Sequence, residues 1–182
     1  MDATAHYRQL VQLGREEFLA AAVPAALVEF RTADDLGDGA RSLSGQTVGS
    51  APPVGAGGID ETRPHDPRAG THPTGDAGDL TIYPLAKKAG ASFPDRITLG
   101  RTPNNDLVIA DPSVSRLHAY VKQVGGGWVV ADAASRNGSW LDDAALEPRK
   151  ERTLTSKALL RVGDIDLTFF LAADLYAVLG GV

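Results

Sequence analysis

The sequence predicts an all-β fold over its last hundred residues, either an antiparallel sandwich or a barrel. From Leu80 onward the chain consists of short runs with alternating or continuous apolar character, such as "LTIYPL", "RITLGR", "GWVVAD" and "IDLTFFL". Turn-forming residues separate these runs, among them the glycines at 125–127 and Asn137-Gly138. Many short strands at close spacing, divided by turn signals, are typical of these two architectures.

The N-terminal segment, residues 1–36, is predicted to be helical. Apolar residues recur at helical spacing within residues 4–30, and Pro24 either kinks this helix or begins a second short one that ends near Phe30. We expect the apolar stripe either to pack on the main domain or to act in docking or dimerisation. The stripe consists of Tyr7, Leu10, Val11, Gly14, Phe18 and Ala22.

Residues 37–79 are predicted to be a flexible, disordered linker. The segment holds ten Gly and five Pro in 43 positions and no aromatic residue, so it cannot bury enough apolar surface to offset the entropy of ordering. Thr62 follows two carboxylates within it and is a candidate regulatory phosphosite that could bind back to the main domain. The alternative is that Thr62 is an ordinary linker residue.

The third segment, residues 80–182, is predicted to be the β domain, and "ADLYAVLGG" predicts a short helix at its end. Asp174 stands near the start of this helix and Gly180 is its predicted stop. Trp128 and Trp140 are expected to serve in packing.

Composition narrows the function. A net charge of −5 argues against broad binding to nucleic acid or to an anionic membrane. The chain lacks cysteine, a signal-peptide pattern and any apolar run near the roughly 20 residues of a membrane helix. We therefore expect a cytoplasmic protein without a cofactor. No metal site is predicted either, because the histidines at 65 and 72 lie in the linker.

An unusual set of polar residues lies in the loops of the predicted β domain. Gly100-Arg101 ends one strand, "SVSRLH" holds Ser115, Arg116 and His118, and "SRNGS" holds Arg136, Asn137 and Gly138. Loops of a β-sandwich cluster at its two ends, so the three could meet at one rim. Guanidinium forks, a hydroxyl and an amide together suit a phosphate attached to a peptide.

These motifs, Gly-Arg, Ser-x-x-His and Asn-Gly in this order, resemble the forkhead-associated (FHA) domain family over about residues 80–173. The resemblance implies an FHA-type β-sandwich of about eleven strands and a non-catalytic adaptor that binds phosphothreonine peptides. The expected partners are phosphothreonine-containing proteins, namely a Ser/Thr kinase or its substrates. The oligomeric state stays open.

The resemblance also assigns roles to individual residues. Arg101 and Ser115 would hold the phosphate, Arg116 would add a phosphate or backbone contact, and Asn137 would bond the peptide main chain beside Arg136. The residues expected to be architectural are Gly100, His118 and Gly138.

Two positions depart from the family pattern. Arg136 stands where a small hydroxyl residue is common, and Ser139 stands where Thr is common. Arg136 could strengthen the attraction of phosphate or of an acidic side chain, or it could block the path of the peptide.

Two other functions remain to be weighed. The first is an FHA-like scaffold that binds protein without requiring phosphate. The second is a hydrolase built on Asp111, Ser115 and His118, which is disfavoured because no G-x-S-x-G elbow and no oxyanion-hole loop occur. We therefore assign no catalytic residue. Asn137-Gly138 could in addition form a simple hairpin turn.

Overall fold

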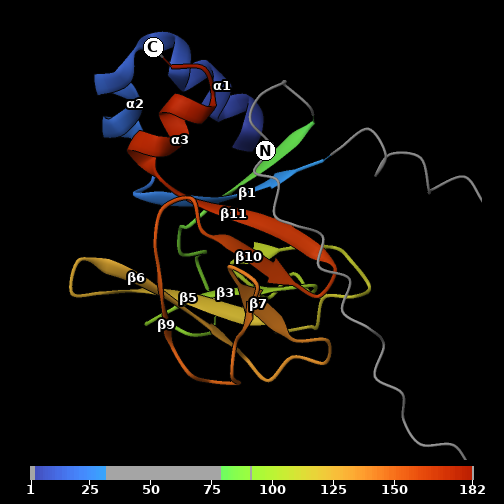
Figure 1. Ribbon diagram of the computed structural model, residues 1–182. Helices are drawn as coiled ribbons and strands as arrows, with labels where there is room; N and C mark the ends of the chain where they lie inside the picture. Colours follow the sequence, from blue (N-terminus) through green and yellow to red (C-terminus); the bar gives the residue numbers. More distant parts are fainter. Residues whose placement is uncertain (1–2, 32–78, 91, 182) are drawn as a thin grey trace, which may run out of the picture.

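The computed structural model describes residues 3–31, 79–90 and 92–181, and within these residues the chain forms two stacked β-sheets (Figure 1). One sheet has the strand order β2-β1-β11-β10-β7-β8 and the other β4-β3-β5-β6-β9. The pairs are antiparallel apart from β3 with β4. The prediction of a sandwich with about eleven strands is confirmed.

The strands of the first sheet are β1 (Ala25–Phe30), β2 (Leu80–Pro84), β7 (Ser139–Leu141), β8 (Ala144–Ala145), β10 (Leu159–Val162) and β11 (Ile165–Leu171). Those of the second sheet are β3 (Ile97–Gly100), β4 (Leu107–Val108), β5 (Ala119–Val124), β6 (Gly127–Asp132) and β9 (Arg152–Leu154).

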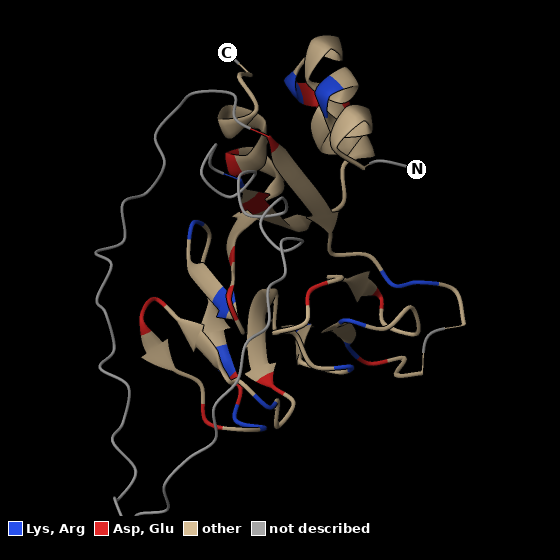
Figure 2. Ribbon diagram, turned by 90° about the vertical axis from the view of Figure 1, so that its right-hand side faces the viewer, with Lys and Arg blue, Asp and Glu red and all other residues tan. Residues whose placement is uncertain are grey.

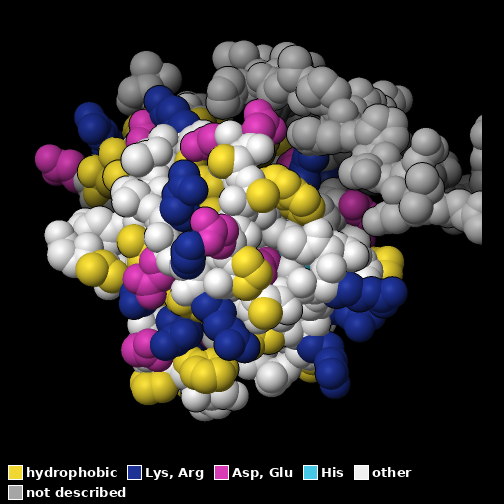
Figure 3. Space-filling model, turned by 60° about the horizontal axis from the view of Figure 1, so that its bottom comes forward, with side chains coloured by type: hydrophobic (Ala, Val, Ile, Leu, Met, Phe, Trp, Pro, Cys, Tyr) yellow, Lys and Arg dark blue, Asp and Glu magenta, His cyan; other side chains and the backbone are white. Residues whose placement is uncertain are grey.

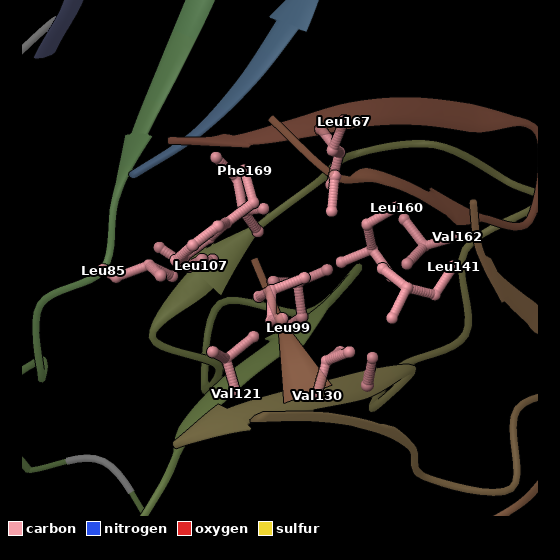
Figure 4. Packing of buried hydrophobic residues seen from close by; sticks show 14 of the residues in the cluster. Leu85, Leu99, Leu107, Val121, Val130, Leu141, Leu160, Val162, Leu167 and Phe169 are labelled. Atoms are coloured by element: carbon pink, nitrogen blue, oxygen red, sulfur yellow. The ribbon is translucent and has the colours of Figure 1, made fainter. Parts of the chain in front are cut away.

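The main core lies between the two sheets. Side chains from both sheets point toward one another there, as Figure 4 shows for Leu99 and Val130 on one side and Leu160 and Phe169 on the other. All four are fully buried. Trp128 is 6% exposed and its ring centroid lies 6.1 Å from that of Phe169, so its predicted packing role is confirmed.

Three helices cover the outer face of the first sheet: α1 (Ala3–Leu13), α2 (Arg15–Ala21) and α3 (Ala172–Val178) (Figure 1). They and strands β1, β2 and β11 enclose a second apolar core, which we call the cap core. Its members are Tyr7, Leu10, Val11, Phe18, Ala26, Val28, Ile82, Phe170, Leu175 and Tyr176. Of the two expectations for the N-terminal helix, packing on the main domain is the one observed.

The structure corrects two details of the N-terminal prediction. Gly14 ends α1, with a φ of 109° that favours glycine, so the predicted stripe spans two helices. Residues 25–30 form strand β1 and not a second helix. Ala25 and Leu27 face the main core while Ala26 and Val28 face the cap core, and a strand covered on both faces shows no alternation that would distinguish it from a helix.

The end of β1 and the start of β2 lie next to each other. The N–H of Arg31 donates to the carbonyl oxygen of Asp79 at 2.9 Å, and β1 pairs with β2 from Ala26 to Phe30. Residues 32–78, with the candidate Thr62, lie outside the described residues. The predicted segment boundaries at 36 and 79 stay predictions.

The short C-terminal helix is present as α3, directly after β11. Gly180 follows its end with a φ of 91°, as expected for a helix stop. Within the part of the chain that the structure describes, no helix is long and apolar enough to cross a membrane.

Candidate functional site

Three loops meet at one edge of the sandwich and enclose an open depression of about 590 Å³. They are the β3–β4 loop, the β4–β5 loop and the β6–β7 loop. The residues that line the depression include Arg101, Ser113, Ser115, Arg116, Arg136 and Asn137. The structure therefore brings together all five residues that the sequence predicts for phosphopeptide contact.

Gly100 allows the β3–β4 and β4–β5 loops to approach each other closely. A Cβ at this position would lie 2.2 Å from the carbonyl oxygen of Arg116 and 2.7 Å from Nδ2 of Asn105. The absence of a side chain lets the N–H of Arg101 donate to the carbonyl oxygen of Ser115 at 2.9 Å. The close approach at Gly100 thus lets the backbone hydrogen bond hold Arg101 and Ser115, the two candidate phosphate ligands, next to each other.

His118 is fully buried and joins two of the site loops. Its Nδ1 accepts a hydrogen bond from the N–H of Ser115 at 2.9 Å, so the ring proton resides on Nε2. Nε2 lies 2.9 Å from the carbonyl oxygen of Gly138 and donates to it. The ring is thus a bridge between the β4–β5 and β6–β7 loops, and both of its nitrogens are used in that role.

Gly138 has the architectural place that the sequence predicts for it. Its φ is 83°, and a Cβ there would lie 3.3 Å from the ring of Trp140. Its N–H donates to the hydroxyl of Ser135 at 3.0 Å. Its carbonyl receives the N–H of Gly163 from the β10–β11 turn at 3.1 Å.

The hydroxyl of Ser115 and the amide of Asn137 are each half engaged by the protein. Ser115 Oγ accepts the N–H of Arg136 at 3.0 Å, which leaves its O–H as a donor. Asn137 Nδ2 donates to the carbonyl oxygen of Ser113 at 2.7 Å, which orients the amide and leaves Oδ1 as an acceptor. The depression therefore offers a fixed hydroxyl donor and a fixed amide acceptor.

Three guanidinium groups, those of Arg101, Arg116 and Arg136, complete the lining. All three residues are exposed, and among the described residues none of the three forms an ion pair. No Asp or Glu is found among the described residues that line the depression. Such an arrangement attracts a multiply charged anion, which several charge-assisted hydrogen bonds would hold.

Two buried polar residues support the site and were not predicted. Asn105 is 2% exposed and its Nδ2 donates to the carbonyl oxygens of Arg116 and Thr102 at 2.6 and 2.9 Å. Asp132, also 2% exposed, accepts the N–H and the hydroxyl of Ser135 at 2.9 and 2.6 Å and the hydroxyl of Ser139 at 2.6 Å. The supporting role of Asp132 could have been inferred from the sequence, because this Asp ends a strand and Ser135 and Ser139 follow it.

The hydrolase arrangement is not assembled. His118 Nδ1 faces the backbone N–H of Ser115 and not its hydroxyl. The carboxylate of Asp111 accepts the N–H and hydroxyl of Ser113 at 2.8 and 2.5 Å and so does not orient the imidazole. Over the described ranges no group of three or more metal-ligating side chains is present.

Elsewhere on the molecule several basic side chains stand beside acidic ones. Figure 2 shows basic and acidic positions distributed together over the sandwich and its loops. In Figure 3, which views the molecule from below, acidic side chains stand beside several of the basic ones. Arg31, Arg96 and Arg161, for example, each pair with a carboxylate.

Comparisons with known proteins agree with this geometry. The model of the FHA domain family matches residues 97–163, which contain all three site loops. The chain is 31% identical over 136 residues to the oxoglutarate dehydrogenase inhibitor of Corynebacterium diphtheriae, covering 73% of this chain and 76% of that protein. It is 30% identical over 100 residues to the glycogen accumulation regulator GarA of Mycolicibacterium smegmatis, covering 53% of this chain and 60% of GarA.

A solved structure is also similar, that of the N-terminal FHA domain of Rad53p from S. cerevisiae in complex with a phosphothreonine peptide. The sequence identity is 23%, the TM-score is 0.43, and the match covers 53% of this chain and 88% of the yeast one.

Proposed function

The chain belongs to the FHA domain family, and from this premise we propose that it is a phosphothreonine-binding adaptor in Ser/Thr kinase signalling. It binds phosphothreonine peptides at the depression between its three site loops, without catalysing a reaction on them. Its partners are phosphorylated proteins, either a Ser/Thr kinase or the substrates of one. The expected compartment is the cytoplasm.

One observation carries the proposal: an open depression lined by one hydroxyl donor, one amide acceptor and three guanidinium groups that form no ion pair with any described residue. A phosphate monoester carries about −1.5 to −2 charges at neutral pH and three acceptor oxygens. Arginine matches these oxygens with two parallel N–H groups. The hydrogen-bond donors and positive charges of the depression therefore match the oxygens of a phosphorylated side chain, and its amide acceptor matches the adjoining peptide backbone.

Four of the five predicted contact residues divide into two roles, and the fifth, Arg136, lies beside Asn137. Arg101 and the Ser115 hydroxyl bind the phosphate oxygens, and Arg116 adds a third contact from the same loop as Ser115. Asn137 Oδ1 accepts an N–H of the peptide main chain, because the hydrogen bond from Nδ2 to Ser113 orients the amide and leaves this oxygen as an acceptor. Gly100, His118 and Gly138 hold the loops in place without touching the peptide.

The first prediction concerns Arg101. An oriented phosphothreonine peptide library is applied to the full chain, and the selected peptides are measured by calorimetry. We expect dissociation constants near the micromolar range, about −8 kcal/mol. Arg101→Ala should weaken binding by at least about tenfold, because each charge-assisted hydrogen bond contributes about 1.5–3 kcal/mol.

The matched control is Arg152→Ala, which removes an exposed arginine from β9, away from the depression. It should bind like the unaltered chain, and unphosphorylated peptides should not bind. Retained affinity in Arg101→Ala, or partners captured equally well after phosphatase treatment, would support the scaffold function that needs no phosphate.

A further inference from the structure

Arg136 is the guanidinium of the site that comes from a different loop than the proposed phosphate ligands. Arg101 and Arg116 flank Ser115 through the β3–β4 and β4–β5 loops, whereas Arg136 comes from the β6–β7 loop. The phosphate brings at most about two negative charges, and the depression presents three positive ones with no carboxylate in its described lining. At least one positive charge is left without a counter-charge when a phosphothreonine binds.

The position of Arg136 is fixed by its backbone. Its N–H donates to the Ser115 hydroxyl at 3.0 Å, and the next residue, Asn137, is held by the carbonyl of Ser113. Arg136 thus stands between the hydroxyl proposed to bind phosphate and the amide proposed to bind the peptide main chain. A peptide bound by these two groups would therefore pass close to Arg136.

Among the described residues, no carboxylate forms an ion pair with Arg136. Ser135, before it, is bound by the buried Asp132, whose oxygens are engaged by Ser135 and Ser139. Arg136 itself is exposed and forms no ion pair within the described part of the chain. Its guanidinium is therefore available to a group brought by the ligand.

We propose, on the basis of the function proposed above, that Arg136 makes this site select phosphothreonine peptides with a second anionic group beside the phosphothreonine. The group is a carboxylate or a second phosphate, since both accept two parallel hydrogen bonds from a guanidinium. Arg136 is in this view a specificity-determining residue, and the phosphothreonine itself is bound by the other ligands.

The test is a charge scan on the full chain. Starting from a bound phosphothreonine peptide with neutral flanks, Glu and its neutral counterpart Gln are placed in turn at each of the three positions on either side. In a parallel series a phosphoserine replaces Glu. At one or two positions Glu or phosphoserine should bind about tenfold more tightly than Gln, and added salt should reduce the difference.

Arg136→Gln should abolish this preference by lowering the affinity for the Glu and phosphoserine peptides to that for the Gln peptide. Any loss of affinity for the neutral-flanked peptide should be smaller than the loss for these anionic peptides. Arg152→Gln, which removes the same charge from β9, should keep the preference. A preference for phosphoserine alone would identify the second group as a phosphate, and a preference for both would include carboxylates.

Three results would overturn the inference. Equal affinity for Glu, Gln and phosphoserine at every position, with phosphothreonine binding intact, would refute this inference but not the proposed function. A preference that survives Arg136→Gln would assign it to another residue. Tighter binding of every peptide by Arg136→Gln would show that Arg136 obstructs the peptide. If no phosphothreonine peptide binds at all, the proposed function fails as well.

Discussion

The carbonyl oxygen of Arg116 connects two of the loops that form the candidate site. It accepts Nδ2 of the buried Asn105 at 2.6 Å and the hydroxyl of Thr102 at 3.0 Å, and it lies against the open side of Gly100. Both donors belong to the β3–β4 loop, so this carbonyl joins that loop to the β4–β5 loop. The absence of one methyl group at residue 100 makes the junction sterically allowed.

The residue-scale prediction is therefore made for Gly100→Ala. Its Cβ would meet backbone 2.2 Å away, which cannot rotate aside, so the loops must separate. We expect the free energy of unfolding to fall by about 2–4 kcal/mol, the range of overpacking combined with a lost buried hydrogen bond. The affinity for phosphopeptides should also fall. Urea denaturation and calorimetry measure the two effects.

Gly127→Ala is the matched control, because this strand glycine in β6 would bring its Cβ only to within 3.6 Å of the Val124 carbonyl. It should change stability by less than about 1 kcal/mol. Equal effects of the two substitutions would show that the close approach at Gly100 is not what constrains the site.

At the scale of elements, the sequence predicted what depends on local pattern. The strands after Leu80 are marked by short apolar runs with turn residues between them, and these signals can be seen in the local sequence. The three site motifs are likewise short and occur at the spacing of the FHA family. Strand β1 differs from the predicted helix because it is buried on both faces, by the second sheet on one side and by the helices on the other. Asn105 and Asp132 escaped prediction for a similar reason: their role consists of contacts with loops distant in the sequence.

Another element-scale feature is a clamp around Asp106, whose side chain is fully buried. One carboxylate oxygen accepts Nζ of Lys87 at 2.7 Å and both the N–H and the hydroxyl of Thr98 at 2.8 and 3.0 Å. The other accepts the N–H of Lys88 at 2.7 Å. The clamp ties the segment after β2 to strand β3 and to the loop that bears Arg101.

The clamp leads to a prediction on pH. Burial alone would raise the pKa of Asp106, but the Lys87 ammonium and the N–H groups of Thr98 and Lys88 outweigh it and hold the pKa below its ordinary value. A lowered folded-state pKa stabilises the fold above the unfolded value of about 4. This contribution is lost as the pH falls from about 4 through the folded-state pKa.

Asp106→Asn should lower the free energy of unfolding at pH 7 by about 1–3 kcal/mol, because the new NH₂ must face an N–H or ammonium donor at either oxygen position. The difference from the unaltered chain should shrink as the pH falls below about 4. Denaturation midpoints from pH 3 to 7 measure it. Asp95→Asn, at an exposed pair with Arg96, should change little, and a pH-independent deficit in Asp106→Asn would contradict the assignment.

At the scale of the whole molecule, the binding site and the helical cap lie at opposite ends of β11. The turn before β11 touches the site, since the N–H of Asp164 donates to the hydroxyl of Ser113 at 3.0 Å. Helix α3 begins directly after the other end of the strand. The seven residues of β11 separate the two by about 20 Å. No residue of the cap core lines the depression.

The helical cap should therefore stabilise the fold without changing the affinity for phosphopeptides. A substitution of Phe18 tests this expectation. Its side chain is fully buried, with ring centroids 5.8 Å from Tyr7 and 5.3 Å from Tyr176. Phe18→Ala should reduce the free energy of unfolding by about 3–5 kcal/mol, whereas the phosphopeptide dissociation constant, measured well below the melting temperature, should stay within about twofold. Leu19→Ala, on the same helix and 41% exposed, should alter neither quantity by much. A large loss of affinity in folded Phe18→Ala would mean that the cap communicates with the site along β11.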